Sequence, residues 1–66
     1  MTQQERIKSV VDHAEEVFGS SQAAERWLTE PSPALDFLTP LAMLNTEAGA
    51  QIVSEILGRI EHGVFS

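Results

Sequence analysis

The residues of this chain that could do chemistry are few, and their spacing does not combine them into a catalytic site. The two histidines, His13 and His62, fall in different predicted helices, and neither has a second histidine four positions away to form a metal-binding pair. Glu15 and Glu16 are adjacent, and adjacent positions diverge by about 100° around a helix, so their carboxylates do not face each other. The chain has no cysteine, which excludes a disulfide framework, a thiolate zinc site and a cysteine nucleophile. We therefore expect no enzyme activity, no metal ion and no cofactor.

The composition predicts one small acidic domain. The 66 residues carry ten acidic and four basic side chains, for a net charge of −6, and this length suits a single domain over residues 1–66. Affinity for nucleic acid depends on Lys and Arg, so the acidity argues against DNA or RNA as a partner of this chain. The N-terminus lacks the apolar region of a signal peptide, and no apolar run approaches the roughly 20 residues of a membrane span. We expect a cytoplasmic protein that binds other proteins.

Hydrophobic residues recur with the period of a helix, and no segment alternates as a strand would. Thr2 and Glu5 have the spacing of a capping box, which predicts the start of a first helix, and Gly19 is placed to end it. Either Ser20 or Ser21 is expected to cap a second helix over about residues 22–29. The apolar stripe of the first helix consists of Ile7, Val10, Val11, Ala14, Val17 and Phe18, and that of the second consists of Ala24, Trp27 and Leu28.

The middle of the chain contains three prolines, which predict breaks between helices. Pro31 and Pro33 predict an ordered turn of irregular or short helical structure, and we expect its apolar residues, Ala34, Leu35, Phe37 and Leu38, to pack against the rest of the domain. Thr39 followed by Pro40 is typical of an N-cap with proline at the first helical position, so a short third helix should occupy residues 40–44. Asn45 is a candidate terminator.

The last helix has the clearest boundaries, because Thr46 can cap its start and Gly63 can end it. Gly49 falls within its expected apolar stripe, where a missing side chain lets another helix approach closely. That stripe consists of Ala48, Ile52, Val53, Ile56, Leu57 and Ile60. The whole pattern predicts an all-α fold, a compact single domain of about four helices in which the first and last are the longest.

Two features leave alternatives open. Gly58 points away from the stripe, and an exposed glycine within a helix costs about 1 kcal/mol relative to alanine. It is either a tolerated surface glycine or a place where the backbone of a partner approaches. Glu15 and Glu16 lie near the C-terminal end of the first helix, where the helix dipole disfavours negative charge. They form either a solvated face or a docking site for a basic partner.

Three stretches of the sequence, in order, resemble a known family. These are W-L-x-x-P-x-P-A-L from Trp27 to Leu35, T-P-L from Thr39 to Leu41, and the ending L-G-R-I-E-H-G-V. Together they resemble the toxin-binding domain of Xre/MbcA/ParS-type antitoxins, over about residues 10–65. Such antitoxins belong to type II toxin–antitoxin modules, and their partners are RES-domain toxins that consume NAD.

The resemblance implies a function and a contact surface. The antitoxin domain binds the toxin and obstructs its NAD cleft, and the C-terminal end of the domain lies close to that cleft. On this sequence the implied partner-binding residues are Gly58, Arg59, Glu61, His62, Gly63, Val64 and Phe65. A toxin site that receives the phosphates of NAD would present basic residues, and these could pair with Glu55, Glu61 or the terminal carboxylate.

The resemblance also shows a departure, because fuller members carry an N-terminal helix-turn-helix domain that binds the operator. We expect this chain to be either a short antitoxin that works without binding DNA or a fragment of a longer one. The alternative function is a generic helical oligomerisation or adaptor domain with no toxin partner. Whether the domain forms a homo-oligomer stays open.

Overall fold

The computed structural model describes residues 2–63, and this range forms four α-helices and one short 3-10 helix, with no strand. The elements are α1 (Gln3–Phe18), α2 (Ser21–Thr29), η1 (Pro33–Leu35), α3 (Pro40–Met43) and α4 (Glu47–His62). The prediction of an all-α domain with the longest helices first and last is confirmed.

The boundaries of α1 and α2 follow from the capping residues. The Thr2 side chain accepts a hydrogen bond from the Glu5 N–H at 3.1 Å, and the Glu5 carboxylate accepts from the Thr2 N–H at 3.3 Å, which completes the predicted capping box. Gly19 ends α1 in the left-handed conformation, with φ of 83°. Ser20 caps α2 by accepting from the Ala23 N–H at 3.1 Å, so α2 begins at Ser21.

Two threonines start the remaining helices as predicted. The Thr39 hydroxyl accepts from the Ala42 N–H at 3.2 Å, and the Thr46 hydroxyl accepts from the Gly49 N–H at 3.0 Å. The third helix ends at Met43, one residue earlier than expected, because Leu44 already forms its C-cap.

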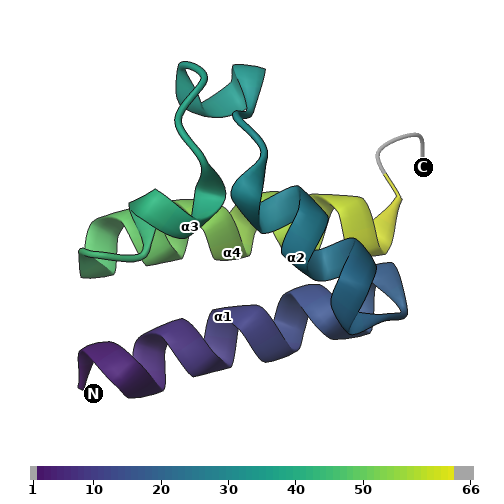
Figure 1. Ribbon diagram of the computed structural model, residues 1–66, viewed down its shortest axis with the longest axis horizontal. Helices are drawn as coiled ribbons and strands as arrows, with labels where there is room; N and C mark the ends of the chain where they lie inside the picture. The colour runs from purple at the N-terminus through teal and green to yellow at the C-terminus, as the bar shows by residue number, and fades with distance from the viewer. Residues whose placement is uncertain (1, 64–66) are drawn as a thin grey trace.

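The helices α1 and α4 run side by side in the same direction, and α2 and α3 pack along them (Figure 1). The core lies where the helices meet and contains only apolar side chains among the described residues: Val10, Ala14, Ala24, Leu28, Leu44, Ala50, Val53 and Leu57. Arg6 ties the start of α1 to the end of α3, because its guanidinium donates to the carbonyl oxygens of Leu44 and Asn45, each at 3.2 Å.

The buried face of α4 differs from the predicted stripe. Val53 and Leu57 are buried as expected, but Ala48 is exposed, and Ile52 and Ile60 are 42% and 38% exposed. The buried positions are instead Gly49, Ala50, Val53 and Leu57. The reason is that α4 packs against both α1 and α3, so its buried face is rotated toward these two helices and leaves one edge of the apolar stripe in solvent.

Gly49 allows the close approach that the sequence predicted. A Cβ atom at this position would overlap the carbonyl oxygen of Met43 and lie 2.9 Å from its carbonyl carbon. Because Met43 is the last residue of α3, the approaching element is indeed another helix.

The proline-rich segment of residues 31–39 protrudes from the helical body, and we call it the protruding segment (Figure 1). Leu35 is buried as expected, but the expectation that its apolar neighbours pack inward is wrong. Ala34 is exposed, and Phe37 and Leu38 are 71% and 53% exposed. The segment closes on itself through the bridge between Ser32 and Leu38, which turns these side chains outward.

Candidate functional site

Four of the residues expected to bind a partner line one hollow on the outer face of α4. Gly58, Arg59, His62 and Gly63 lie around it together with Glu55, and its volume is about 520 Å³. We call it the α4 hollow. Gly58 and Arg59 lie three and four residues after Glu55, and His62 lies one further turn along the helix. These four residues therefore share one side of α4 near its C-terminal end.

The α4 hollow exists because Gly58 has no side chain. Apart from its chain neighbours and the nearby backbone of α4 itself, no atom lies within 4 Å of the position that a Cβ would occupy at Gly58, so the space above this glycine is open. The interpretation of Gly58 as a residue pointing away from the core is confirmed. A partner could bring its backbone closer to α4 here than at any residue that carries a side chain.

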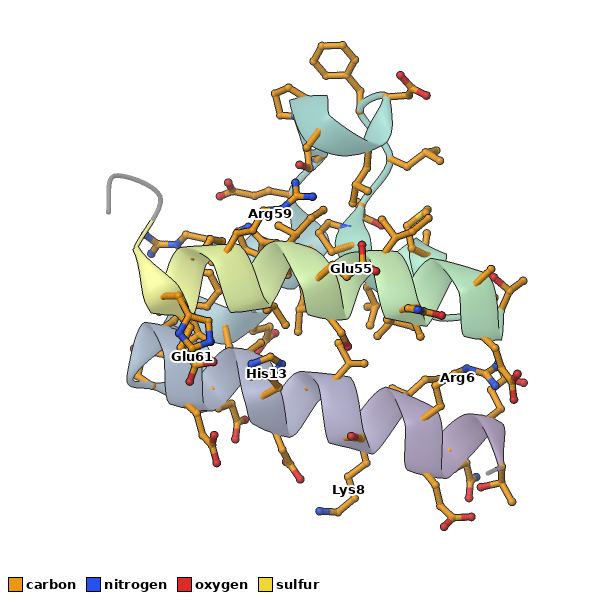
Figure 2. The ribbon with its side chains drawn as sticks, turned by 180° about the vertical axis from the view of Figure 1, so that it is seen from behind. Arg6, Lys8, His13, Glu55, Arg59 and Glu61 are labelled. Atoms are coloured by element: carbon orange, nitrogen blue, oxygen red, sulfur yellow. The ribbon has the colours of Figure 1, made fainter. Side chains whose placement is uncertain are left out.

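The α4 hollow offers charged groups of both signs. Glu55 and Arg59 extend from the side of α4 that faces away from α1 (Figure 2). The exposed Ile52 lies three residues before Glu55 on the same helix, so it adds apolar surface beside the hollow. The outer face of α4 therefore combines an acidic group, a basic group and apolar surface around a place without a side chain. Glu55 is one of the acidic groups expected to pair with basic residues of a partner, and the structure places it beside Gly58 on this face.

Glu61 lies apart from the other expected partner-binding residues. Its Oε1 atom is 3.2 Å from Nε2 of His13, and the two side chains point toward each other between α4 and α1 (Figure 2). The side chains are 44% and 30% exposed for Glu61 and His13, so the pair sits at the edge of the helix interface. Glu61 thus contacts α1, while the α4 hollow opens on another side of α4.

Two expected partner-binding residues, Val64 and Phe65, lie outside the described residues. The last residue of the α4 hollow, Gly63, ends α4 with φ of 80°, and its N–H donates to the Ile60 carbonyl at 3.3 Å. The described part of the expected contact surface is therefore the final turns of α4.

The acidic pair of α1 is divided between two environments. Glu15 is half-buried and lines a smaller hollow, of about 210 Å³, where α1, α2 and α3 meet. Val11, Leu28 and Leu41 supply apolar walls there. Glu16 is exposed and does not line this hollow. The two carboxylates therefore have different surroundings, as expected for adjacent positions on a helix.

The structure of residues 2–63 also bears on metal binding and on membrane spanning. This part of the chain brings no three His, Asp or Glu side chains together in a group that could hold a metal ion. None of the helices formed by the same residues has both the length and the apolar character that crossing a bilayer requires.

The chain is similar to a known family of domains over most of its length. The sequence model of the family described as the antitoxin Xre/MbcA/ParS C-terminal toxin-binding domain matches residues 13–63. This range includes the α4 hollow and every described residue of the expected contact surface. No solved structure matches the chain.

Curated relatives carry antitoxin names. The chain is 44% identical to a protein named Antitoxin Xre from Photorhabdus laumondii and 40% identical to one of the same name from Yersinia enterocolitica, each over 92% of this chain and 42% of the relative. It is 30% identical to the Prs ADP-ribosylating antitoxin of a Sphingobium species, over 92% of this chain and 40% of that protein. The chain spans about two fifths of the length of these relatives.

Proposed function

Because the chain belongs to the family of Xre/MbcA/ParS antitoxin C-terminal toxin-binding domains, we propose that it binds and neutralises a RES-domain toxin. In this proposal residues 1–66 act as one toxin-binding domain, and neutralisation takes place in the cytoplasm, where the toxin would consume NAD. The name of the Sphingobium relative refers to ADP-ribosylation, a reaction for which NAD is the donor, and this supports a toxin that uses NAD.

The observation that carries the proposal is the α4 hollow around Gly58. An open space on a helix lets a loop of the partner approach the backbone of α4, and Arg59 and Glu55 beside it can form charge-assisted hydrogen bonds with that loop. His62 and Gly63 extend the surface to the end of the helix. In this proposal α4 and the residues after it, including Val64 and Phe65, cover the entrance to the NAD cleft of the toxin.

Charge also supports a toxin whose site binds NAD. The chain has a net charge of −6. A cleft that receives the two phosphates of NAD presents basic groups, and an acidic domain is attracted to such a surface and would associate with it quickly. Within the proposal Glu61 contributes to this attraction from the edge of the α4 face, since its side chain is 44% exposed.

Co-expression tests the proposal against the alternative of a generic helical adaptor domain. A RES-domain toxin would be induced with and without the full 66-residue chain, with growth and cellular NAD as the readouts. Neutralisation restores both growth and NAD. An adaptor domain without a toxin partner would leave growth arrested and NAD depleted, and that result would refute the proposal.

A further inference from the structure

Phe37 is the most exposed of the large apolar side chains in the described residues. It is 71% exposed, and Leu38 beside it is 53% exposed. Both belong to the protruding segment, which stands away from the helical body (Figure 1). An aromatic ring in water contributes nothing to the stability of the free domain, since the gain from an apolar side chain depends on removing it from water.

The backbone holds this ring outward in a defined position. Asp36 and Phe37 have φ of 56° and 66°, a region that residues with side chains rarely adopt. Hydrogen bonds lock the turn: the Ser32 carbonyl accepts from the N–H groups of Leu35 at 2.9 Å and Phe37 at 2.8 Å, and Ser32 donates to the Leu38 carbonyl at 3.0 Å. A side chain presented by a rigid turn loses little conformational freedom on binding.

The α4 hollow contains one residue type that is common among interface hot spots, Arg59, but no large apolar side chain that a partner could bury. Its lining consists of two glycines, Glu55, Arg59 and His62. Binding energy in interfaces is concentrated in a few buried anchors, which are often aromatic, and a stable interface buries roughly 800 Å² on each partner. The surface that binds a toxin must therefore extend beyond the hollow to an apolar anchor.

The protruding segment is placed to supply that anchor. Glu55 and Arg59 extend from the side of α4 from which the protruding segment rises, whereas His13 and Glu61 lie on the side of α1 (Figure 2). The exposed Ile52 of α4 adds apolar surface to the helix next to Glu55. A partner seated against this side of α4 meets the protruding segment as well.

We propose that Phe37 is the aromatic anchor of the toxin-binding surface and inserts into an apolar socket of the toxin that is bordered by Lys or Arg. This inference rests on the proposed function. Asp36 next to the ring and Glu55 on α4 supply the negative charge that such a border would pair with. A second copy of this chain is the poorer occupant, because each copy carries a net charge of −6.

A substitution at Phe37 tests the anchor without disturbing the fold. Phe37→Asn removes the ring and keeps a residue that tolerates positive φ. We expect the Kd for the RES-domain toxin that the wild-type chain binds to rise at least about 10-fold, with an unchanged or higher Tm of the free domain. Phe37→Leu, which keeps an apolar side chain, should recover part of the affinity. Ala34→Ser, a matched change on an exposed residue of the same segment, should leave the affinity unchanged.

The outcomes separate this inference from the proposed function. If the wild-type chain does not bind the toxin by calorimetry, the proposed function itself is wrong. If the wild type binds and Phe37→Asn binds equally well, the proposed function stands and the anchor is wrong. The anchor is also wrong if Phe37→Asn lowers the Tm by several degrees, or if it changes only the oligomeric state in sedimentation and leaves the toxin affinity intact.

Discussion

Nε2 of His13 lies 3.2 Å from Oε1 of Glu61, a contact between residues 48 positions apart that joins the middle of α1 to the last turn of α4. It fixes Glu61 at the junction of the two helices, while the α4 hollow lies on another side of α4. The same carboxylate can therefore act in two ways, as a link within the domain and as negative charge near the proposed toxin surface.

A double-mutant cycle separates these two roles. His13→Ala, Glu61→Ala and the double variant should give a coupling free energy below about 1 kcal/mol, because the pair is partly exposed and screened by solvent. In calorimetry with the toxin, Glu61→Ala should weaken binding and His13→Ala should not. Equal losses of affinity for both single variants would mean that Glu61 acts only by supporting the fold.

Substitutions at Gly58 should stabilise the free domain, since a Cβ there would meet no atom within 4 Å beyond its chain neighbours and the nearby backbone of α4. Gly58→Ala should raise the free energy of unfolding by about 1 kcal/mol and Gly58→Gln by about 0.5 kcal/mol, because glycine is the poorer helix former. Gly58→Gln should also weaken toxin binding by about 10-fold or more, since its side chain fills the α4 hollow. Full affinity of Gly58→Gln would place the interface on another face.

Gly49→Ala, on the same helix, should have the opposite effect. Its Cβ would overlap the Met43 carbonyl oxygen, and a backbone atom cannot move aside as a flexible side chain can. We expect a loss of at least about 3 kcal/mol, a large share of the stability of a domain of this size. Urea denaturation measures the change, and a loss no larger than that of an ordinary surface substitution would contradict the close approach of α3.

Arg6→Met should destabilise the domain by about 1–2 kcal/mol, because it removes the donors that reach the Leu44 and Asn45 carbonyls. Methionine keeps most of the apolar stem of the side chain. Lys8→Met is the matched control on α1. Within residues 2–63 Lys8 pairs only with Asp12, and both side chains are largely exposed, so its loss should change the free energy of unfolding by no more than about 0.5 kcal/mol. Equal effects of the two substitutions in urea denaturation would refute the proposed role of Arg6.

Removal of the last three residues tests the expected contact at Val64 and Phe65. The core cluster of the described residues runs from Val10 to Leu57, so circular dichroism and the Tm should remain nearly those of the full chain. The toxin affinity should fall. Unfolding of the truncated chain would show that the end of the chain supports the domain, and unchanged affinity would remove both residues from the proposed surface.

The helix boundaries could be predicted from the sequence because local chemistry determines them. The capping box of Thr2 and Glu5, the left-handed Gly19 and the caps Thr39 and Thr46 act on backbone groups within a few residues. Such signals do not depend on the rest of the fold, and the structure has each of them where the sequence placed it.

The orientation of the helices could not be predicted in the same way. Apolar residues cover more than one side of α4, so periodicity alone did not show that Ala50 faces the core while Ile52 and Ile60 remain exposed. Phe37 was expected to pack inward because it is apolar. Its outward position depends on hydrogen bonds of the whole protruding segment, which the local sequence does not reveal. The contacts of Arg6 with Leu44 and of His13 with Glu61 join distant positions, and single-residue patterns carry no sign of them.

The corner between α1 and α2 gives the chain an internal optical reporter. Trp27 is its single tryptophan, the chain has no tyrosine, and the indole lies half-buried with its ring centroid 5.5 Å from that of Phe18. Unfolding separates the two rings and exposes the indole to water, so its fluorescence emission should shift to longer wavelength. One unlabelled chromophore can therefore follow the denaturation of every variant proposed above, since none of them alters either ring.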